Sequence, residues 1–184
     1  MTIIVLEIRV PSHAAVGSEG ELRAALLHLL PRVATYLMSF LTLGIFWVGQ
    51  QTQLQQLSHT DRPYTWIQLG FLAGVSLMPF STGLLAEFTR FRTALLLYWL
   101  NVLLLGAMLY LSWRGAERGG LVREGTPAEV GGLIRQRVVV AQTLYAIGAA
   151  LCVVNTYWSI GFILLVQLNY AIAPRIPGLS RLTS

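Results

Sequence analysis

Long stretches of this chain carry no charged residue, and they constrain its fold more than any other feature. No Asp, Glu, Lys or Arg occurs in the 21 residues from Thr93 to Trp113, or in the 37 residues from Val138 to Pro174. A helix of about 20 apolar residues crosses the roughly 30 Å hydrocarbon core of a bilayer. The first stretch therefore predicts one membrane-spanning helix, and the second predicts two.

The composition of the whole chain points the same way. Hydrophobic residues fill 55% of the 184 positions and charged residues only 11%, whereas about 25% of residues are charged in an ordinary soluble domain. One charge-free stretch also fits the buried core of a large soluble protein, but several in so short a chain do not. We therefore predict an all-α fold, a polytopic membrane helix bundle that forms a single domain over residues 1–184.

The breaks between the hydrophobic runs predict six spans, with the first one truncated in this chain. The ten residues before Pro11 would rise only about 15 Å as a helix, which is half a bilayer. We expect residues 1–10 to be the second half of a first helix that begins upstream of Met1. The other predicted segments are helix 2 at 26–48, helix 3 at 64–86, helix 4 at 93–113, helix 5 at 138–157, helix 6 at 159–173 and a tail at 174–184.

The longest polar stretch, residues 114–137, predicts a linker that contains a short interfacial helix. Thr126-Pro127-Ala128-Glu129 has the pattern of a helix start, with Pro at the first helical position. Pairs of glycines at 119–120 and 131–132 predict breaks on either side. Within helix 3, Pro79 predicts a kink whose freed carbonyl must be met by neighbouring groups.

All thirteen basic residues are arginine, and the net charge is +5. The arginines lie in the breaks between hydrophobic runs, as in a charged rim at a membrane face, so we expect the lipid bilayer and no nucleic acid as partner. If the N-terminus is cytoplasmic, eight arginines fall on the cytoplasmic side and five on the other. The positive-inside rule favours that orientation, and with six spans both termini are then cytoplasmic.

The chain lacks the clustered titratable groups that an enzyme needs. Its three histidines, His13, His28 and His59, have no metal-ligand spacing, and no glycine-rich phosphate loop or nucleophile elbow is present. No acidic residue falls in the middle of a complete predicted span, which argues against a transporter with a buried carboxylate relay. We predict that the chain is not an enzyme and has no metal site and no cofactor.

The polar residues inside the predicted spans are hydroxyls and amides. Such groups usually form hydrogen bonds between helices in a membrane, although they also line ion paths together with hydrophobic constrictions. Composition alone leaves a channel, a transporter and a passive scaffold open. These residues are Ser39, Thr42, Ser76, Ser81, Thr82, Asn101, Gln142, Thr143, Asn155, Gln167 and Asn169.

Four runs between Met1 and Trp113 carry a further signal. They are MTIIVLEIRVP, YLMSFLTLGIFWVGQQ, LAGVSLMPFSTGLLAEF and LLLYWLNVLLLGAMLYLSW. In order and spacing, they resemble the first four helices of the prokaryotic branch of the transmembrane protein 175 family of potassium channels. Beyond Arg114 the resemblance rests on hydropathy alone. The family's signature Arg-x-x-x-Phe-Ser-Asp is absent and would lie upstream of Met1, and Gln50 and Gln51 stand where the second helix of relatives carries histidine.

The resemblance implies six-helix subunits that assemble as a homotetramer in the plasma membrane of a prokaryote. In that family the first helix lines one central pore, through which K⁺ permeates. By the match, Thr2 corresponds to a hydroxyl ring that favours potassium, and Ile3 and Leu6 correspond to a hydrophobic pore constriction. Thr2 and Leu6 are four residues apart and share one face of a helix. The candidates for helix packing are Ser39, Trp47, Gln50 and Asn101.

The sequence leaves two functions open besides such a channel. The first alternative is a proton-leak pathway or small secondary transporter, and the second is a non-conducting membrane scaffold. Reversal potentials measured in ion gradients separate these functions, because the current through a channel follows the potassium gradient without coupling.

Overall fold

The computed structural model describes residues 17–172, except for the side chains of His28, of several residues between 30 and 36, and of Ala128. Its regular elements over that range are all helices, which confirms the predicted all-α class for this part of the chain. They are α2 (Glu19–Leu54), α3 (Arg62–Glu87), α4 (Arg92–Arg118), α5 (Ala128–Ala150), a single 3₁₀ turn η2 (Leu151–Val153), and α6 (Thr156–Ile172). The predicted first helix at residues 1–10 and the tail at 174–184 lie outside the described residues.

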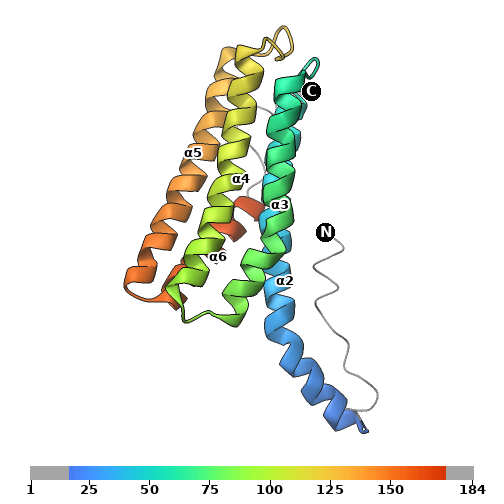
Figure 1. Ribbon diagram of the computed structural model, residues 1–184, viewed down its shortest axis with the longest axis vertical. Coiled ribbons are helices and arrows are strands. Elements are labelled where there is room, and N and C mark those ends of the chain that lie inside the picture. Colours follow the sequence, from blue (N-terminus) through green and yellow to red (C-terminus); the bar gives the residue numbers. More distant parts are fainter. Residues whose placement is uncertain (1–16, 173–184) are drawn as a thin grey trace.

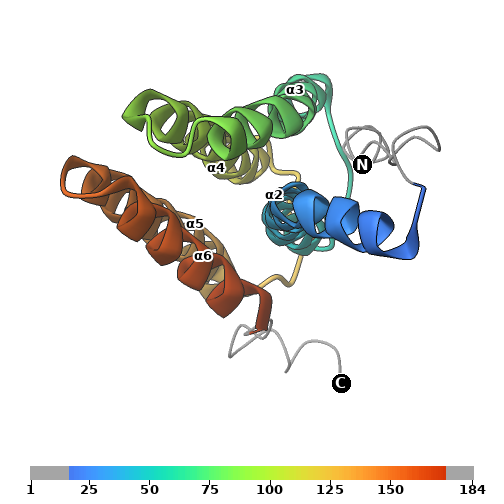
Figure 2. The same ribbon diagram turned by 90° about the horizontal axis from the view of Figure 1, so that it is seen from below.

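The helices pack as two antiparallel pairs, with a fifth helix beside them. Figure 2 shows α3 and α4 as one pair and α5 and α6 as the other, with α2 next to both pairs. The contacts agree, because α2 packs against α3 on one side and α6 on the other. The first turns of α2 extend beyond the end of the other helices (Figure 1). The bundle core therefore begins well inside α2, at Met38.

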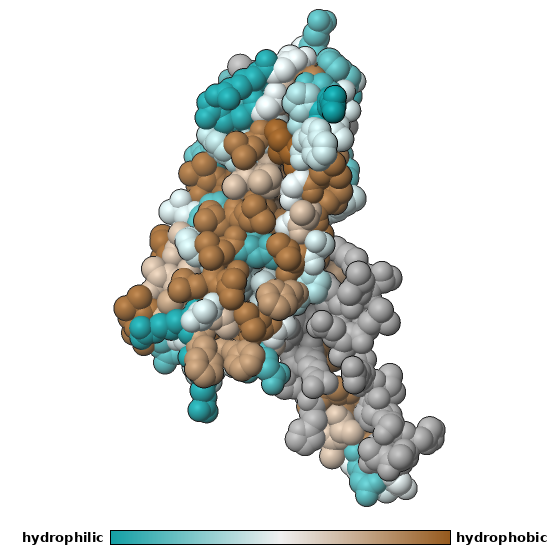
Figure 3. Space-filling view, in the orientation of Figure 1, coloured by the Kyte–Doolittle hydropathy of each residue, from teal (hydrophilic) through white to brown (hydrophobic). Residues whose placement is uncertain are grey.

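Within residues 17–172, three stretches of helix are long and apolar enough to cross a membrane. They are Arg62–Glu87, Arg92–Arg118 and Glu129–Val153, the last of which combines α5 with η2. On the face shown in Figure 3, hydrophobic residues cover the middle of the bundle, and hydrophilic residues gather toward its ends. Large apolar side chains of these helices, such as Trp66 on α3 (64% exposed) and Leu165 on α6 (67% exposed), face outward. Such an exterior suits hydrocarbon rather than water.

Local sequence signals fix where two of the helices begin. At the start of α3, the side chain of Asp61 accepts a hydrogen bond from the backbone N–H of Tyr64 at 2.8 Å, and Pro63 follows within the first turn. At the start of α2, Ser18 Oγ accepts from the N–H of Glu21 at 3.3 Å. Both side chains satisfy donors that a helix leaves unpaired at its first turn.

The predicted interfacial helix within residues 114–137 is absent as a separate element from this described segment. Instead α4 continues to Arg118, and α5 begins at Ala128 and runs unbroken past the glycine pair at 131–132. Gly131 lies where α5 approaches α4, and a Cβ added there would sit 2.5 Å from Glu117 Oε1 and 3.3 Å from Trp113 Nε1. That glycine permits close packing of the two helices rather than a break in α5.

The turn between α5 and α6 also lies earlier than expected. The predicted bounds of helix 5 (138–157) and helix 6 (159–173) place it at residue 158, whereas the chain turns through η2 and reaches α6 at Thr156. Asn155 explains the difference, because its side-chain Oδ1 accepts from the N–H of Tyr157 at 2.8 Å. This asparagine caps the start of α6, and so it ends the turn instead of beginning it.

The α2–α3 and α4–α5 loops are joined at one end of the bundle. An isolated antiparallel bridge pairs Leu57 with Val122. The N–H of Ser58 donates to the carbonyl of Leu121 at 2.9 Å, and the N–H of Arg123 donates to the carbonyl of Gln56 at 2.8 Å. Gly120 makes this return possible, because its φ of 65° lies in the left-handed region that glycine tolerates. These backbone hydrogen bonds thereby hold the α2–α3 hairpin and the α4–α5 hairpin together at their loops.

Candidate functional site

The three residues predicted to line a pore, Thr2, Ile3 and Leu6, lie outside the described residues. Their roles as a hydroxyl ring and a hydrophobic constriction stay predictions. Among residues 17–172, the polar side chains inside the bundle are the remaining candidates for a functional site.

A closed ring of hydrogen bonds lies at the centre of the bundle and joins three helices. Gln167 on α6 donates through Nε2 to Thr42 Oγ1 at 2.8 Å and to the Tyr98 hydroxyl at 2.7 Å. Thr42 Oγ1 and the Tyr98 hydroxyl lie 3.1 Å apart. All three residues are at most 1% exposed.

The direction of each bond in this ring follows from counting protons. Thr42 donates its one hydroxyl proton to the carbonyl of Met38 at 2.8 Å, so Thr42 accepts from the other two residues. Tyr98 therefore donates to Thr42 and accepts from Gln167. The acceptor left over is Gln167 Oε1, which is buried and has no hydrogen-bond partner in the described part of the chain.

Asn101, one of the predicted packing residues, lies buried between α4 and α3. With its amide turned to satisfy both ends, the nitrogen donates to the carbonyl of Gly74 and the oxygen accepts from the N–H of Met78, each at 3.1 Å. These two backbone groups belong to the turn of α3 just before Pro79. Asn101 thus supplies hydrogen bonds beside the proline, where the helical ladder of α3 is interrupted.

The glutamines at the end of α2 hold this helix to α3 and α4. Gln50, which is 7% exposed, donates through Nε2 to Gln68 Oε1 on α3. Gln53 donates to the carbonyl of Leu109 at 3.0 Å and accepts from the Ser112 hydroxyl at 2.7 Å. These amides make contacts between helices at the end of the bundle where the two loops are joined.

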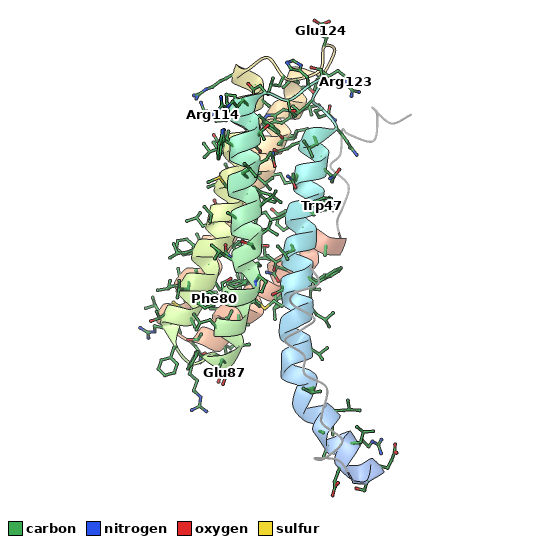
Figure 4. All side chains as sticks on the ribbon, turned by 45° about the vertical axis from the view of Figure 1, so that its right-hand side comes forward. Trp47, Phe80, Glu87, Arg114, Arg123 and Glu124 are labelled. Atoms are coloured by element: carbon green, nitrogen blue, oxygen red, sulfur yellow. The ribbon has the colours of Figure 1, made fainter. Side chains whose placement is uncertain are left out.

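The other two packing candidates differ from each other. Ser39 is 1% exposed, and its hydroxyl has no hydrogen-bond partner among residues 17–172. Trp47 is 52% exposed and points away from the bundle (Figure 4). A packing role for Trp47 would therefore involve lipid or a second chain, and it stays a prediction.

Hydroxyls and amides in the spans do not all bond between helices. Thr42, Gln142 and Gln167 do so, and Gln142 donates to the carbonyl of Val102 on α4 at 3.3 Å. In contrast, Ser76 and Thr143 are exposed and donate back to carbonyls of their own helices. Analysis of the sequence missed Tyr98, because an aromatic residue in an apolar run has the pattern of simple packing.

Charged side chains gather at the two ends of the bundle. Figure 4 shows Arg114, Arg123 and Glu124 at one end and Glu87 at the other, with Trp47 and Phe80 in between. At the first end, Glu117 forms an ion pair with Arg135 and accepts from Trp113 Nε1 at 2.8 Å. Within residues 17–172 no three His, Cys, Asp or Glu side chains come together as a metal site. This arrangement offers structural hydrogen bonds rather than a catalytic centre.

Comparisons with known proteins agree with the family that the first four hydrophobic runs resemble. The profile of the family described as "Endosomal/lysosomal potassium channel TMEM175" matches residues 1–79. A protein of Chamaesiphon minutus described as a potassium channel is 27% identical over 94% of this chain and 86% of its own length. Another, from a Chryseobacterium species, is 27% identical over 94% of this chain and 85% of its own.

A solved structure extends the likeness to three dimensions. The crystal structure of a lysosomal potassium-selective channel TMEM175 homolog from Chamaesiphon minutus superposes with a TM-score of 0.75 at 26% identity. The match covers 95% of this chain and 90% of the other. The helical arrangement described above is therefore similar to that of this channel.

Proposed function

Because the chain belongs to the TMEM175 family of ion channels, we propose that it is a potassium-permeable channel of a prokaryotic plasma membrane. Four copies assemble around one axis, and the segment that precedes α2 lines the pore on that axis. K⁺ is the ion that permeates. The family profile covers this segment, and the relatives in two bacteria are described as potassium channels.

The observation that carries the proposal is the tight packing at the centre of the subunit. Thr42, Tyr98 and Gln167 are at most 1% exposed there, and the hydroxyls of Thr42 and Tyr98 are both engaged in hydrogen bonds. An ion path needs hydroxyls or carbonyls that are free to replace the water around the ion. The interior of a single bundle is a poor candidate for such a path, which favours a pore between subunits.

Thr2, Ile3 and Leu6 supply the chemistry of that pore. A ring of leucine side chains at position 6 imposes a barrier, because a hydrated ion must lose water to pass a narrow apolar constriction. Ile3 adds to that constriction. Thr2 lies one helical turn away on the same face, where its hydroxyls replace part of the lost water. Selectivity then arises from partial dehydration rather than from a filter of backbone carbonyls.

The charges at the two ends orient the subunit with both termini in the cytoplasm. The end that carries the α2–α3 and α4–α5 loops holds Arg62, Arg114, Arg118 and Arg123, whereas the α3–α4 loop holds Arg90 and Arg92. The positive-inside rule places the more basic end on the cytoplasmic side. Since α6 ends on that side, the C-terminus follows it into the cytoplasm.

Reversal potentials in reconstituted bilayers test this function. The full-length protein, with any coding sequence upstream of Met1 included, is recorded in mixed potassium and sodium gradients. The current of a potassium channel reverses close to the potassium equilibrium potential at every gradient. A reversal potential that follows pH would instead identify a proton leak, and bilayers that stay silent with folded protein would identify a scaffold.

A further inference from the structure

A narrow cavity opens between α2, α4, α5 and α6, near the end of the bundle where α6 finishes. Its volume is about 50 Å³, and its wall is mostly apolar, with Phe46 and Leu109 among the lining side chains. A smaller cavity of about 30 Å³ adjoins it and shares Gly49, Leu109, Arg137 and Val138. Arg137 thus lines both spaces.

Arg137 is a charged residue inside a helix that is long and apolar enough to cross a membrane. Its guanidinium lies over the ring of Tyr170 on α6, 5.8 Å from the centroid. Within residues 17–172 the ion pair found is that of Glu117 with Arg135, so no described carboxylate neutralises Arg137. Charges at membrane depth are costly and almost always have a partner.

Two further polar groups in the same wall lack partners in the described part of the chain. The Tyr145 hydroxyl belongs to a residue that is 2% exposed, and it has no hydrogen-bond partner. Gln142 Oε1 is also buried and unpaired. Arg137, Gln142 and Tyr145 all line the cavity, and together they offer a cation, an acceptor and a hydroxyl donor. Buried polar groups without partners are rare in native structures and require an explanation.

The position of Arg137 along α5 points to a lipid as the missing partner. It lies about 13 Å along α5 from Ala128, on the side that the arginine bias assigns to the cytoplasm. Anionic lipids make that leaflet negative, and basic pockets between membrane helices bind their head groups. The cavity is too small for an acyl chain, so only part of a head group enters, and the chains stay in the bilayer.

We propose that the cavity beside Arg137 binds the head group of an anionic phospholipid from the cytoplasmic leaflet. The phosphate pairs with the guanidinium of Arg137. A hydroxyl or ester oxygen of the head group reaches toward Gln142 and Tyr145. This site is separate from the proposed channel function. Lipid binding is measured without ion conduction, so either proposal can fail without the other.

Lipid retention and thermal stability of the purified full chain test the proposal. The protein in neutral detergent receives phosphatidylglycerol or phosphatidylcholine with the same acyl chains, and native mass spectrometry counts the bound lipid. The unmodified protein should retain phosphatidylglycerol preferentially and melt at a higher temperature with it. Arg137→Gln should lower this retention about tenfold, as expected for loss of a charge-assisted hydrogen bond.

Arg114→Gln is the matched control. Arg114 also lies over a tyrosine, 5.9 Å from the ring of Tyr110, but it is exposed and lines neither cavity. It should keep the lipid preference of the unmodified protein. Tyr145→Phe keeps the ring and removes the hydroxyl, so it should weaken retention while phosphatidylglycerol stays preferred.

Several outcomes would overturn the proposal, and the first needs no variant. Equal retention of the two lipids by the unmodified protein excludes a head-group site. An unchanged preference in Arg137→Gln, or an equal loss in Arg114→Gln, leaves only the general attraction of basic residues to anionic lipid. Inorganic phosphate that reproduces the gain in melting temperature would identify a site for free anions instead.

Discussion

The hydroxyl and amide groups of this bundle differ in whether a second helix offers them a hydrogen-bond partner. Thr42 sits where α4 and α6 both approach α2, and it receives two hydrogen bonds from them. Thr143 has the same side chain but faces outward, so it donates to the carbonyl of Val139 in its own helix at 2.9 Å. The residue type can be read from the sequence, whereas the approach of a second helix cannot.

Removal of the Tyr98 hydroxyl tests the ring at this scale. Tyr98→Phe takes away the donor to Thr42 and one acceptor of Gln167, while the ring continues to fill the core. Hydrogen bonds between membrane helices contribute about 0.6 kcal/mol on average and up to about 1.7. We expect the free energy of unfolding to fall by about 1 kcal/mol, which is measured as a lower melting temperature in detergent. Tyr157→Phe, at a residue 57% exposed, is the control, and equal melting of the two variants would contradict the ring.

Leu6→Ala tests the constriction proposed for the pore. With a shorter side chain in each of the four subunits, the ring that they form together is wider, and the ion keeps more of its water. Conductance should rise, and discrimination between potassium and sodium should fall, in bilayer recordings of the full-length protein. Thr2→Val keeps the shape but removes the hydroxyl, so it should reduce selectivity with less effect on conductance. If Leu6→Ala changes neither property, Leu6 is a packing residue and the pore lies elsewhere.

Among the helices, the close approach of α4 and α5 depends on a glycine. A Cβ added at Gly106 would lie 1.8 Å from Gln142 Nε2 and 2.3 Å from its Cδ. The Gln142 side chain would have to move as a whole and would lose its hydrogen bond to the Val102 carbonyl. Gly106 therefore gives the amide of Gln142 its place between the two helices.

The pair Gly106→Ala and Gly132→Ala separates packing from helix propensity. Nothing lies within 4 Å of a Cβ added at Gly132. Alanine there should therefore raise the free energy of unfolding by up to about 1 kcal/mol through its helix propensity, and the melting temperature should rise with it. The same substitution at Gly106 should lower the melting temperature. Thermal unfolding monitored by circular dichroism compares the two variants, and a gain at both positions would show that α4 and α5 are not in close contact at Gly106.

The sequence predicts where helices lie better than it predicts where they end. Runs without charge locate α3 and α4, because a charge at membrane depth is costly. The same rule misplaces the end of α4, since Trp113 and Ala116 are buried against Leu121 and extend the helix past Arg114. Glycine is equally ambiguous, because it marks a turn at Gly120 but a helix contact at Gly131. Only the neighbouring helix distinguishes these two uses.

For the whole molecule, the class and family could be predicted from the sequence, but the pairing of helices could not. Low charge and long apolar runs are properties of composition and order, and they suffice for an all-α membrane protein. The partners of Thr42 lie 56 and 125 residues away in the chain. No local pattern encodes such distances, so Tyr98, Ser112 and the cavity at Arg137 became visible only in the folded bundle.

Assembly of four chains is the prediction at this scale. Native mass spectrometry of the detergent-solubilised full-length protein should give four times the mass of one subunit. With Cys152 replaced by alanine, Leu6→Cys should form disulfides between subunits, because the proposed pore has residue 6 near its axis. Leu165→Cys on the outer face of α6 should not. A species that stops at the dimer, or crosslinks from residue 165 alone, would contradict this arrangement.

The hydrogen bond between Gln167 and Thr42 also fixes an order of events during synthesis. These residues are 125 positions apart, so the ribosome needs about 6–25 s at 5–20 residues per second to reach the second after making the first. During that interval Thr42 has been made, but its partner on α6 has not. Its hydroxyl is not left unpaired, because the carbonyl of Met38 in the same helix accepts its proton at 2.8 Å. When α6 is made, Gln167 thus adds a hydrogen bond to a Thr42 hydroxyl whose proton is already bound within α2.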